Sequence, residues 1–363
     1  MIKIQRFIDK YIGGILCLAL SLSSRRVIRE PQRIAVVKLW AVGESVLTLP
    51  MIASLKKRFP HASLSVFCRL RNKQVYAGLP FIDEIIVCEP ESLRTIWSLR
   101  SAFDIVIDCE PYLNISALLT SWIGGNRIGF SHGMRSLLYD TKIEYDDGQH
   151  VVLTYMDLVE HLSIHSVPTS LVQLSTSKSD VLVVKSWLKN QFFSRGKIFG
   201  ICASAAESGL SRLWPLQNYG ELINVLVETH HASIILVGTK KDQGTMDQLR
   251  FMSKYPERVG NAAGATTLGQ LFALVKKCNV FISNDTGPMH VAAAQGVPTV
   301  GLFDPNTPVR FAPYGRKNGF VYKPTRPFPC INVHKGVIDC KHSNHMSKIT
   351  VEDVLKEITT ILQ

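Results

Sequence analysis

Closely spaced cysteines are missing from this 363-residue sequence, because none of its eight cysteines forms a CxxC pair with another. That absence argues against a redox centre or a zinc ribbon. Most of the cysteines lie within apolar, strand-like runs, where reduced and buried cysteines are usually found, so a cytoplasmic protein is favoured over a secreted disulfide framework. Long low-complexity tracts are missing too, and the whole chain is therefore expected to fold.

The apolar run near the N-terminus is too short to span a membrane. It covers residues 11–22, has Gly13 and Gly14 near its start, and lacks a convincing small-residue cleavage site, whereas a spanning helix needs about 20 apolar residues. Basic residues flank it on both sides: Lys3, Arg6, Lys10, Arg25, Arg26, Arg29 and Arg33. This pattern predicts an interfacial helix within residues 1–32, peripheral on the inner face of the cytoplasmic membrane, whose anionic headgroups would be its partner. The alternative is a helix that packs on its own domain.

Acidic residues are in the minority, since 29 Asp and Glu face 41 Lys and Arg for a formal charge of +12. Such a surface attracts polyanions, which include nucleic acid, anionic lipid and phosphorylated glycolipid. Charge alone does not choose among them, but no nucleic-acid recognition motif accompanies it, so no nucleic-acid partner is expected.

Length and pattern predict an α/β protein with two Rossmann-like domains. Short, continuous apolar runs alternate with helical patterns in both halves, as in parallel sheets covered on both faces. The expected strands are 34–37, 64–68, 84–87, 104–109 and 127–130, then 198–202, 233–237, 280–283 and 299–303. The domains are predicted at 33–175 and 176–363, joined within the Ser-, Thr- and Pro-rich residues 166–179. A helix is expected at 46–59, and a last helix at 351–362 that can cross back onto the first domain.

The strongest local signal is the stretch Ser283-Asn284-Asp285-Thr286-Gly287-Pro288-Met289-His290, which follows a buried strand and leads into a helix of small residues. A turn of this kind points free backbone N–H groups and the positive end of the helix at one spot, which binds phosphate. Gly287 permits close approach of a ligand, and Pro288 is tolerated early in a helix. The alternative is a helix start capped by Asp285 or Thr286. His290 alone is more typical of a packed histidine.

The run from Asp285 to Val300, continuing through Leu302-Phe303-Asp304-Pro305, resembles the signature of glycosyltransferase family 9, the lipopolysaccharide heptosyltransferases. Residues 36–50, 104–111, 128–130 and 212–215 are similar to the family in the right order, so the resemblance spans residue 33 to the C-terminus. It implies a GT-B fold, with two Rossmann-like domains facing a cleft. It also implies an acceptor on the first domain and an activated sugar, usually ADP-heptose, on the second.

The first loop departs from the family it resembles. The family commonly has Gly-Asp there, with the Asp as candidate general base, and this sequence has Gly43-Glu44. An inverting transfer needs a base within hydrogen-bond reach of the acceptor hydroxyl, and Glu44 on a cleft-facing loop would supply it, with Gly43 as part of the acceptor loop. The alternative is a carboxylate favoured by the dipole of a helix N-terminus.

The resemblance also implies the donor-binding residues. Arg212 falls where the family has a basic residue against the diphosphate, and a guanidinium can stabilise charge on the leaving nucleotide. Ser204 is a candidate to donate a hydrogen bond to a phosphate oxygen, and Ser208 and Ser211 compete for that role. Asp242 is a candidate to bind the ribose hydroxyls. The residues predicted to bind the nucleotide-sugar donor are Ser204, Arg212, Asp242, Asp285, Thr286, Gly287, Pro288 and His290.

No metal and no cofactor are predicted beyond the nucleotide-sugar co-substrate. A C-terminal cluster has ligand types that could bind zinc, but its spacing matches no strong zinc pattern. Its members are Cys330, His334, Cys340, His342 and His345. The sequence thus predicts an inverting, metal-independent glycosyltransferase acting on a glycolipid or oligosaccharide. The alternatives are a different nucleotide-sugar donor on the same fold, or a catalytically silent paralogue that binds nucleotide sugar or glycolipid.

Overall fold

The computed structural model describes residues 9–20, 30–191, 196–205, 210–324, 329–331, 337 and 345–363. Among these residues the chain divides into two compact units, which meet in sequence between Pro168 and Thr169. The division falls within the Ser-, Thr- and Pro-rich segment 166–179, a few residues before the junction expected at 175. Each unit is an α/β domain, and the predicted fold class is confirmed.

The first unit contains a six-stranded, all-parallel sheet in the order β3-β2-β1-β4-β5-β6. Its strands are β1 (Arg33–Val37), β2 (Ser63–Cys68), β3 (Glu84–Val87), β4 (Phe103–Asp108), β5 (Gly124–Phe130) and β6 (Thr141–Ile143). β1, β2 and β4 are almost wholly buried, which explains their continuous apolar sequences. Chain order reverses between β1 and β4, so their carboxyl ends flank the point where ligands bind in open α/β sheets.

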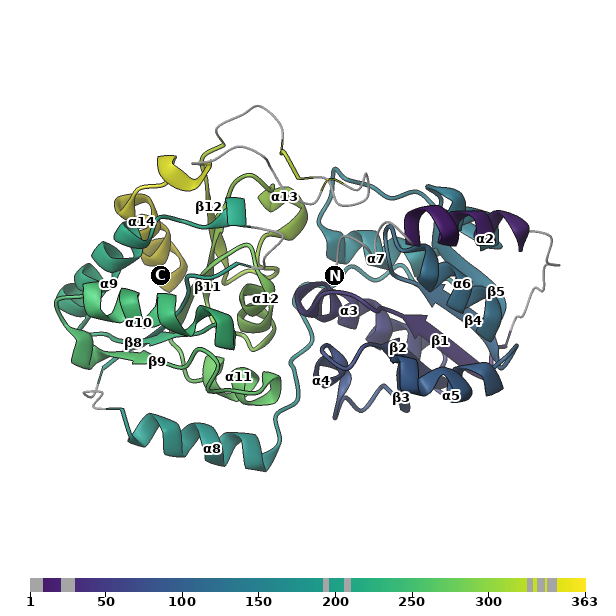
Figure 1. Ribbon diagram of the computed structural model, residues 1–363, viewed down its shortest axis with the longest axis horizontal. Helices are drawn as coiled ribbons and strands as arrows, with labels where there is room; N and C mark the ends of the chain where they lie inside the picture. The colour runs from purple at the N-terminus through teal and green to yellow at the C-terminus, as the bar shows by residue number, and fades with distance from the viewer. Residues whose placement is uncertain are drawn as a thin grey trace. The chain divides into compact units, whose positions relative to one another are not determined.

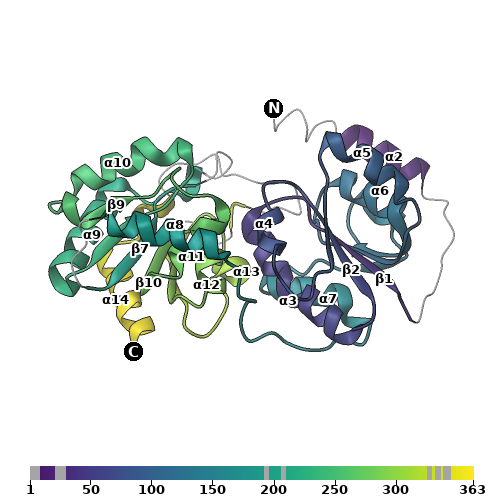
Figure 2. The same cartoon turned by 90° about the horizontal axis from the view of Figure 1, so that it is seen from below.

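Helices cover the sheet of the first unit. α3 (Val42–Arg58) and α7 (Val151–Glu160) pack against each other and lie side by side in Figure 2. α6 (Asn114–Ile123) packs on β4 and β5, where its Ile123 joins a buried cluster with Val37 and Val106. α3 begins at Val42 rather than at the expected Val46, because the glycine loop itself forms the first helical turn.

A short N-terminal helix packs on the outside of α6. It consists of a π-helical turn, η1 (Asp9–Gly13), followed by α2 (Gly14–Ala19), and Figure 1 shows α2 beside α6. The Asp9 carboxylate accepts hydrogen bonds from the backbone N–H groups of Asn114 (3.0 Å) and Ile115 (2.7 Å), which caps the start of α6. The flanking basic residues 3, 6, 25, 26 and 29 lie outside the described residues.

The same helix keeps a broad apolar face exposed. Gly13, Gly14 and Cys17 are its buried positions. The exposed apolar side chains are Tyr11, Ile12, Ile15, Leu16, Leu18 and Leu20. The described helices include none with the length and apolar character of a membrane span. Thus the helix packs on its own domain by a narrow stripe and still presents an apolar surface.

The second unit repeats this plan with strand order β12-β11-β10-β7-β8-β9. Its strands are β7 (Ile198–Cys202), β8 (Ser233–Leu236), β9 (Val259–Asn261), β10 (Val280–Asn284), β11 (Thr299–Phe303) and β12 (Gly319–Tyr322). All neighbouring pairs are parallel. The order reverses between β7 and β10, which again places a ligand-binding point at their carboxyl ends. The short β6, β9 and β12 were not among the strands expected from the sequence.

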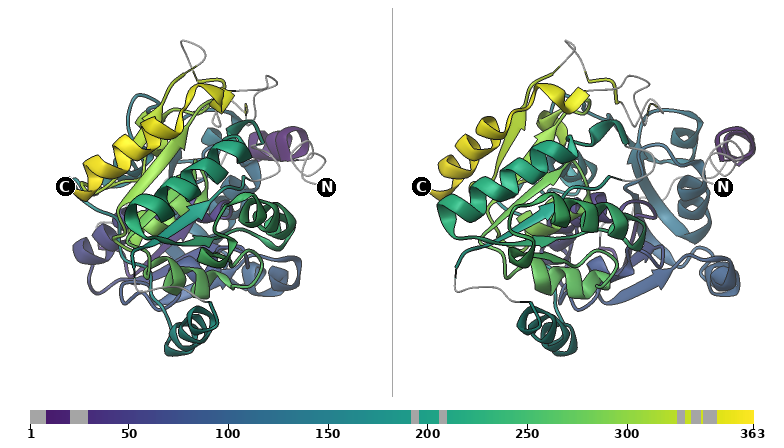
Figure 3. Two further views of the ribbon diagram at one scale, coloured as in Figure 1. Left: turned by 90° about the vertical axis from the view of Figure 1, so that its left-hand side faces the viewer. Right: turned by 60° about the vertical axis from the view of Figure 1, so that its left-hand side comes forward.

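Two layers of helices enclose this second sheet. α9 (Leu216–His230), α10 (Gln243–Met252) and α14 (Val351–Leu362) contribute to one core cluster, and Figure 3 shows α14 alongside α9. α8 (Lys178–Lys189), α11 (Leu268–Val275) and α12 (Gly287–Ala294) contribute to the other. The expectation that the last helix crosses back onto the first domain is wrong, because Val354 and Ile358 of α14 are buried in the core of the second unit.

Candidate functional site

Three charged side chains meet at the switch point of the first sheet. Lys38 directly follows β1, Glu110 lies just beyond β4, and Glu44 lies in the first turn of α3. The Lys38 Nζ is 2.6 Å from Glu44 Oε2 and 3.3 Å from Glu110 Oε2. The side chains of Lys38 and Glu110 are fully buried, whereas that of Glu44 keeps 19% exposure. Of these two carboxylates, Glu44 is the one a substrate can reach.

Glu110 ties the start of the β1–α3 loop to the end of β4. Its Oε1 accepts hydrogen bonds from the backbone N–H groups of Leu39 and Trp40, both at 2.7 Å. Its own N–H donates to Asp108 Oδ1 at 2.9 Å, and Arg135 of η3 (Met134–Leu138) donates to its backbone carbonyl. The carboxylate therefore fixes the loop that leads to Glu44.

The charged groups of this cluster stabilise one another electrostatically. Burial alone would lower the pKa of Lys38, but the carboxylates of Glu110 and Glu44 raise it well above the ordinary lysine value. Burial raises the pKa of Glu110. The Tyr155 hydroxyl of α7 donates to Glu44 Oε2 at 3.3 Å, and burial raises the pKa of Tyr155 well above its usual value. Lys38 and Tyr155 therefore keep their protons at neutral pH and remain hydrogen-bond donors to Glu44.

Glu44 was expected on a cleft-facing loop, with a helix N-terminus as the alternative, and it lies in the first turn of a helix. Since α3 begins at Val42, the buried Gly43 and Glu44 form part of its first turn. A helix holds a side chain more rigidly than a loop does, and the N-terminal dipole favours the ionised carboxylate. Chemically, the arrangement is an accessible carboxylate with a fixed orientation, which suits proton abstraction from a hydroxyl group.

The second unit gathers polar groups where β10 meets α12. Asn284, the last residue of β10, accepts hydrogen bonds from the Tyr219 hydroxyl (2.9 Å) and the Trp214 backbone N–H (3.3 Å). Its amide donates to the Ser204 carbonyl at 3.3 Å. Trp214 is buried, and its indole N–H donates to the Ile349 carbonyl at 2.9 Å. These contacts anchor the Arg212-to-Pro215 segment against the end of β10.

Anchoring of that segment places Arg212 beside Asp285. Arg212 Nη1 lies 3.3 Å from Asp285 Oδ2 and donates to the Asp285 carbonyl at 3.2 Å. Asn306 donates to the same Asp285 oxygen at 2.6 Å. Within the described part of the chain, the buried Arg212 Nε has no hydrogen-bond partner. The guanidinium is thus held from one side and retains donor capacity for an anion.

The start of α12 is open to a ligand. Thr286 is its N-cap, Gly287 and Pro288 follow in the first turn, and no side chain in the described structure makes a capping hydrogen bond there. Thr286 Oγ1 instead lies 3.1 Å from Ser283 Oγ and 3.7 Å from Cys202 Sγ. Backbone N–H groups at a helix start without a cap form an anion-binding site. His290 lies one turn further on and is buried.

The remaining predicted donor residues occupy two places. Ser204 lies near the Asp285 cluster, with its Oγ 3.5 Å from Cys202 Sγ and its carbonyl bonded to Asn284. Asp242 lies beyond β8, where its Oδ2 accepts from the Thr239 N–H (2.7 Å) and hydroxyl (2.6 Å) in a capping box. The structure thus gives Asp242 a capping role. Of the competing serines, Ser211 lies next to Arg212 and Ser208 lies outside the described residues.

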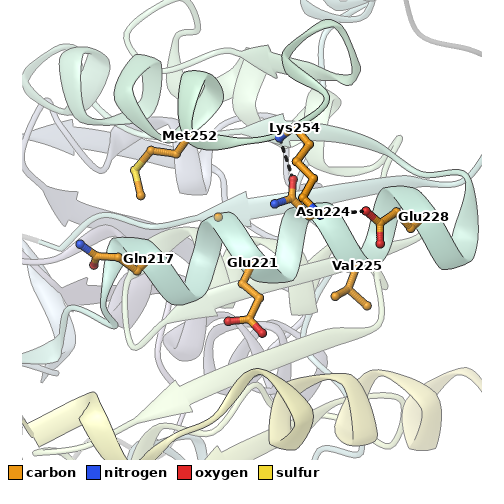
Figure 4. A pocket seen from close by; sticks show the side chains of 8 residues that line it. Gln217, Glu221, Asn224, Val225, Glu228, Met252 and Lys254 are labelled. Atoms are coloured by element: carbon orange, nitrogen blue, oxygen red, sulfur yellow. Dashed lines mark hydrogen bonds and ion pairs between the residues drawn. The ribbon is translucent and has the colours of Figure 1, made fainter.

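The C-terminal cysteine and histidine cluster falls largely outside the described residues, which leave out His334, Cys340 and His342. Among the described residues, no group of three or more His, Cys, Asp or Glu side chains could hold a metal ion. A separate open hollow of about 450 Å³ lies between α9 and the end of α10. Figure 4 shows its lining, which contains none of the predicted site residues: Gln217, Gly220, Glu221, Asn224, Val225, Glu228, Met252 and Lys254.

Sequence reasoning gave no role to several polar residues of these clusters, among them Lys38, Glu110, Tyr155, Asn284 and Asn306. A signal existed for the first two, because a lysine directly after one buried strand and a glutamate directly after another are costly unless the charges pair. Asn284 was quoted within the motif without a role. Nothing in the sequence pointed to Asn306.

Comparison with known proteins identifies a family for this chain. The model of glycosyltransferase family 9 (heptosyltransferase) matches residues 93–337. The chain is 23% identical to the lipopolysaccharide core heptosyltransferase OpsX of Haemophilus influenzae, over 90% of this chain and 96% of that protein.

Solved structures show the same fold. A family 9 glycosyltransferase from Veillonella parvula superposes with a TM-score of 0.77 at 22% identity, covering 91% of this chain and 97% of that one. The ADP-heptose lipopolysaccharide heptosyltransferase II of Escherichia coli gives a TM-score of 0.73 at 24% identity, covering 91% and 98%. The fold is GT-B.

Proposed function

This chain belongs to glycosyltransferase family 9, the heptosyltransferases, and we propose that it transfers heptose from ADP-heptose to a lipopolysaccharide-core acceptor with inversion. The observation that carries the proposal is the pairing of Arg212 with the open start of α12 at the switch point of the second sheet. That pairing offers a guanidinium and backbone N–H groups at one place, which is the chemistry that binds a diphosphate. Relatives with similar sequences over most of their length are heptosyltransferases by name.

The reaction requires a base and a stabilised leaving group. An acceptor hydroxyl gives its proton to the Glu44 carboxylate while its oxygen forms a bond to the anomeric carbon of the heptose. The bond between that carbon and the β-phosphate oxygen breaks, and the electron pair leaves with ADP. Arg212 and the first N–H groups of α12 stabilise the charge that develops on the diphosphate. In this proposal no metal ion and no cofactor are needed, because these groups carry the charge.

A donor screen tests the proposal most simply. The purified protein is incubated with ADP-heptose, or with UDP-, GDP- and other ADP-sugars, together with lipopolysaccharide truncated before its core heptose. Mass spectrometry should show heptose addition from ADP-heptose alone. Transfer from another nucleotide sugar would establish the alternative, in which a glycosyltransferase of the same fold uses a different donor. Binding of ADP-heptose with no transfer to a range of acceptors would establish the silent paralogue.

We further propose that the enzyme works as a peripheral protein on the cytoplasmic face of a membrane. The support is the apolar face of residues 9–20, which continues onto Met134 and Leu137 of η3, both exposed and adjacent to α2. Large exposed apolar patches mark interaction sites, and anionic headgroups complement the net charge of +12.

Vesicle sedimentation tests this second proposal. The variant Ile12→Ser/Ile15→Ser should bind phosphatidylglycerol vesicles roughly 100-fold or more weakly than the wild type, since each buried aliphatic side chain contributes about 1.5 to 3 kcal/mol. The matched control is Val181→Ser/Leu182→Ser, which removes two exposed apolar side chains from α8. Equal sedimentation of all three proteins would exclude residues 9–20 as the contact.

A further inference from the structure

The cluster at the end of β1 has one more carboxylate than a single general base requires. Lys38 carries one positive charge, and Glu44 and Glu110 each supply a carboxylate within salt-bridge distance of its Nζ. With both carboxylates ionised, the three side chains have a net charge of −1. Because Lys38 and Glu110 are fully buried, water does not compensate for either charge when its partner changes.

Protonation of Glu44 would be costly if it were the sole partner of Lys38. When a general base accepts a proton, its carboxylate becomes neutral, and the ammonium beside it loses its counter-ion. A buried ammonium without a counter-ion is strongly unfavourable. With Glu110 3.3 Å away, the same proton transfer takes the cluster from a net charge of −1 to neutral, and Lys38 remains paired.

We propose that Glu110 is a positioning residue of the transfer reaction, acting as the permanent counter-ion of Lys38 so that Glu44 can accept the proton of the acceptor hydroxyl. This proposal rests on the proposed role of Glu44 as general base. In the step, the hydroxyl O–H bond breaks, its proton goes to Glu44, and the sugar is transferred as ADP leaves. Glu110 contacts neither substrate and keeps its charge throughout.

The other polar groups around the cluster do not substitute for Glu110. Burial raises the pKa of Tyr76 in α4 (Lys73–Tyr76), of Cys109 and of Tyr155, so these remain neutral. Asp108 pairs with Arg135 at 2.9 Å. The Arg71 guanidinium, which lies near Glu110 and Tyr112, stacks over the Trp40 ring at 3.6 Å. Tyr145 is a further titratable residue, and it lies near Tyr155.

Glutamine at position 110 separates the charge of Glu110 from its structural role. The amide oxygen of a glutamine can still accept from the Leu39 and Trp40 N–H groups, which hold the β1–α3 loop. In Glu110→Gln, protonation of Glu44 would leave the Lys38 ammonium without a counter-ion and is therefore disfavoured. The acid limb of the kcat/KM pH profile should move to lower pH by roughly one unit or more. The plateau of kcat should fall by roughly tenfold, since a carboxylate that resists protonation is a weaker base.

In the double variant Lys38→Met/Glu110→Gln, we expect the acid limb of the kcat/KM pH profile to move in the opposite direction, to higher pH. This variant removes the ammonium that favours ionised Glu44, so the acid limb should lie above the wild-type position. Replacement of a buried ion pair by uncharged groups is often tolerated, which keeps this variant informative if Glu110→Gln does not fold. A purely structural role for Glu110 would lower kcat in Glu110→Gln and leave its acid limb at the wild-type position.

The experiment measures kcat/KM against pH for ADP release from ADP-heptose with truncated lipopolysaccharide, in the wild type, both variants and Glu44→Gln. The expected order of acid limbs is Glu110→Gln lowest, wild type next, and the double variant highest. If Glu44→Gln is inactive but the acid limb of Glu110→Gln coincides with that of the wild type, the counter-ion role is overturned while the base survives. If Glu44→Gln retains wild-type turnover, the base is elsewhere and the proposed function of Glu44 has failed first.

Discussion

Replacement of Arg212 by alanine should weaken ADP binding by a calculable amount. The guanidinium touches Asp285 through Nη1, at 3.3 Å from its carboxylate and 3.2 Å from its carbonyl, which leaves donors for phosphate oxygens. A hydrogen bond to a charged group contributes about 1.5 to 3 kcal/mol. Loss of one such contact therefore raises the Kd for ADP by roughly 10- to 150-fold.

The same change has a second consequence, because it removes the arginine charge beside the buried Asp285 carboxylate, to which Asn306 still donates a hydrogen bond. Part of the lost affinity would then be repulsion between like charges. Asp285→Asn in the Arg212→Ala background should recover part of the affinity if this is so. The two effects can be separated by comparing the single and double variants.

Isothermal titration calorimetry with ADP is the assay, and Arg316→Ala is the matched control, since it removes an exposed arginine from the same unit. The control should bind ADP as the wild type does at moderate salt, where exposed charges are screened. Unchanged affinity in Arg212→Ala would refute the assignment of Arg212 to the diphosphate. Equal losses in both variants would show a general effect of net charge.

Four further predictions follow from the two clusters and the buried thiols. Glu44→Gln should keep its affinity for ADP-heptose while kcat falls by about 10² to 10⁴, because the amide cannot accept the proton; wild-type kcat would exclude Glu44 as base. Glu44→Asp should change kcat with little change in donor Kd, since the shorter side chain moves the carboxylate; an altered Kd with unchanged kcat would contradict this. Turnover should survive dialysis against EDTA, and a loss restored by added metal would contradict metal independence. Burial raises the pKa of Cys68 and Cys88 to about 12, above the roughly 8.5 of a free thiol, so unfolding releases thiols that ionise more easily. The urea midpoint should therefore decrease as the pH is raised from about 9 to about 11, and an increase would contradict the burial of these thiols.

The fold could be predicted well because its signals are local. Runs such as 84–87, 198–202 and 299–303 are short, continuous and apolar, and each became a strand with the same bounds. The helix 351–362 was also predicted at its full length, from its threonine cap and acidic first turn. The three strands that were not expected are less distinct: β6 and β9 have only three residues each, and β12 alternates more buried with more exposed positions instead of forming a continuous buried run.

The sequence signal at Lys38 and Glu110 did not show which charges pair, because the members of the charge cluster are distant in sequence. Lys38 and Glu110 are separated by 72 positions and meet because β1 pairs in parallel with β4, with Val37 opposite Asp108. That register depends on the whole sheet, and periodicity in one segment does not report it. Glu44 was expected on a loop because Gly43 precedes it, with a helix N-terminus as the alternative, and the structure confirms that alternative by including Gly43 in the first turn of α3.

The central claim, an inverting transfer of heptose, is tested most directly by the configuration of the product. The protein is incubated with ADP-heptose and lipopolysaccharide truncated before its core heptose, and the new glycosidic bond is examined by NMR through its anomeric proton and carbon. We expect one added heptose for each ADP released, with the anomeric configuration opposite to that of the donor. Retention of the donor configuration would contradict direct attack by a hydroxyl activated by Glu44, and binding of ADP-heptose without transfer would contradict the enzyme itself.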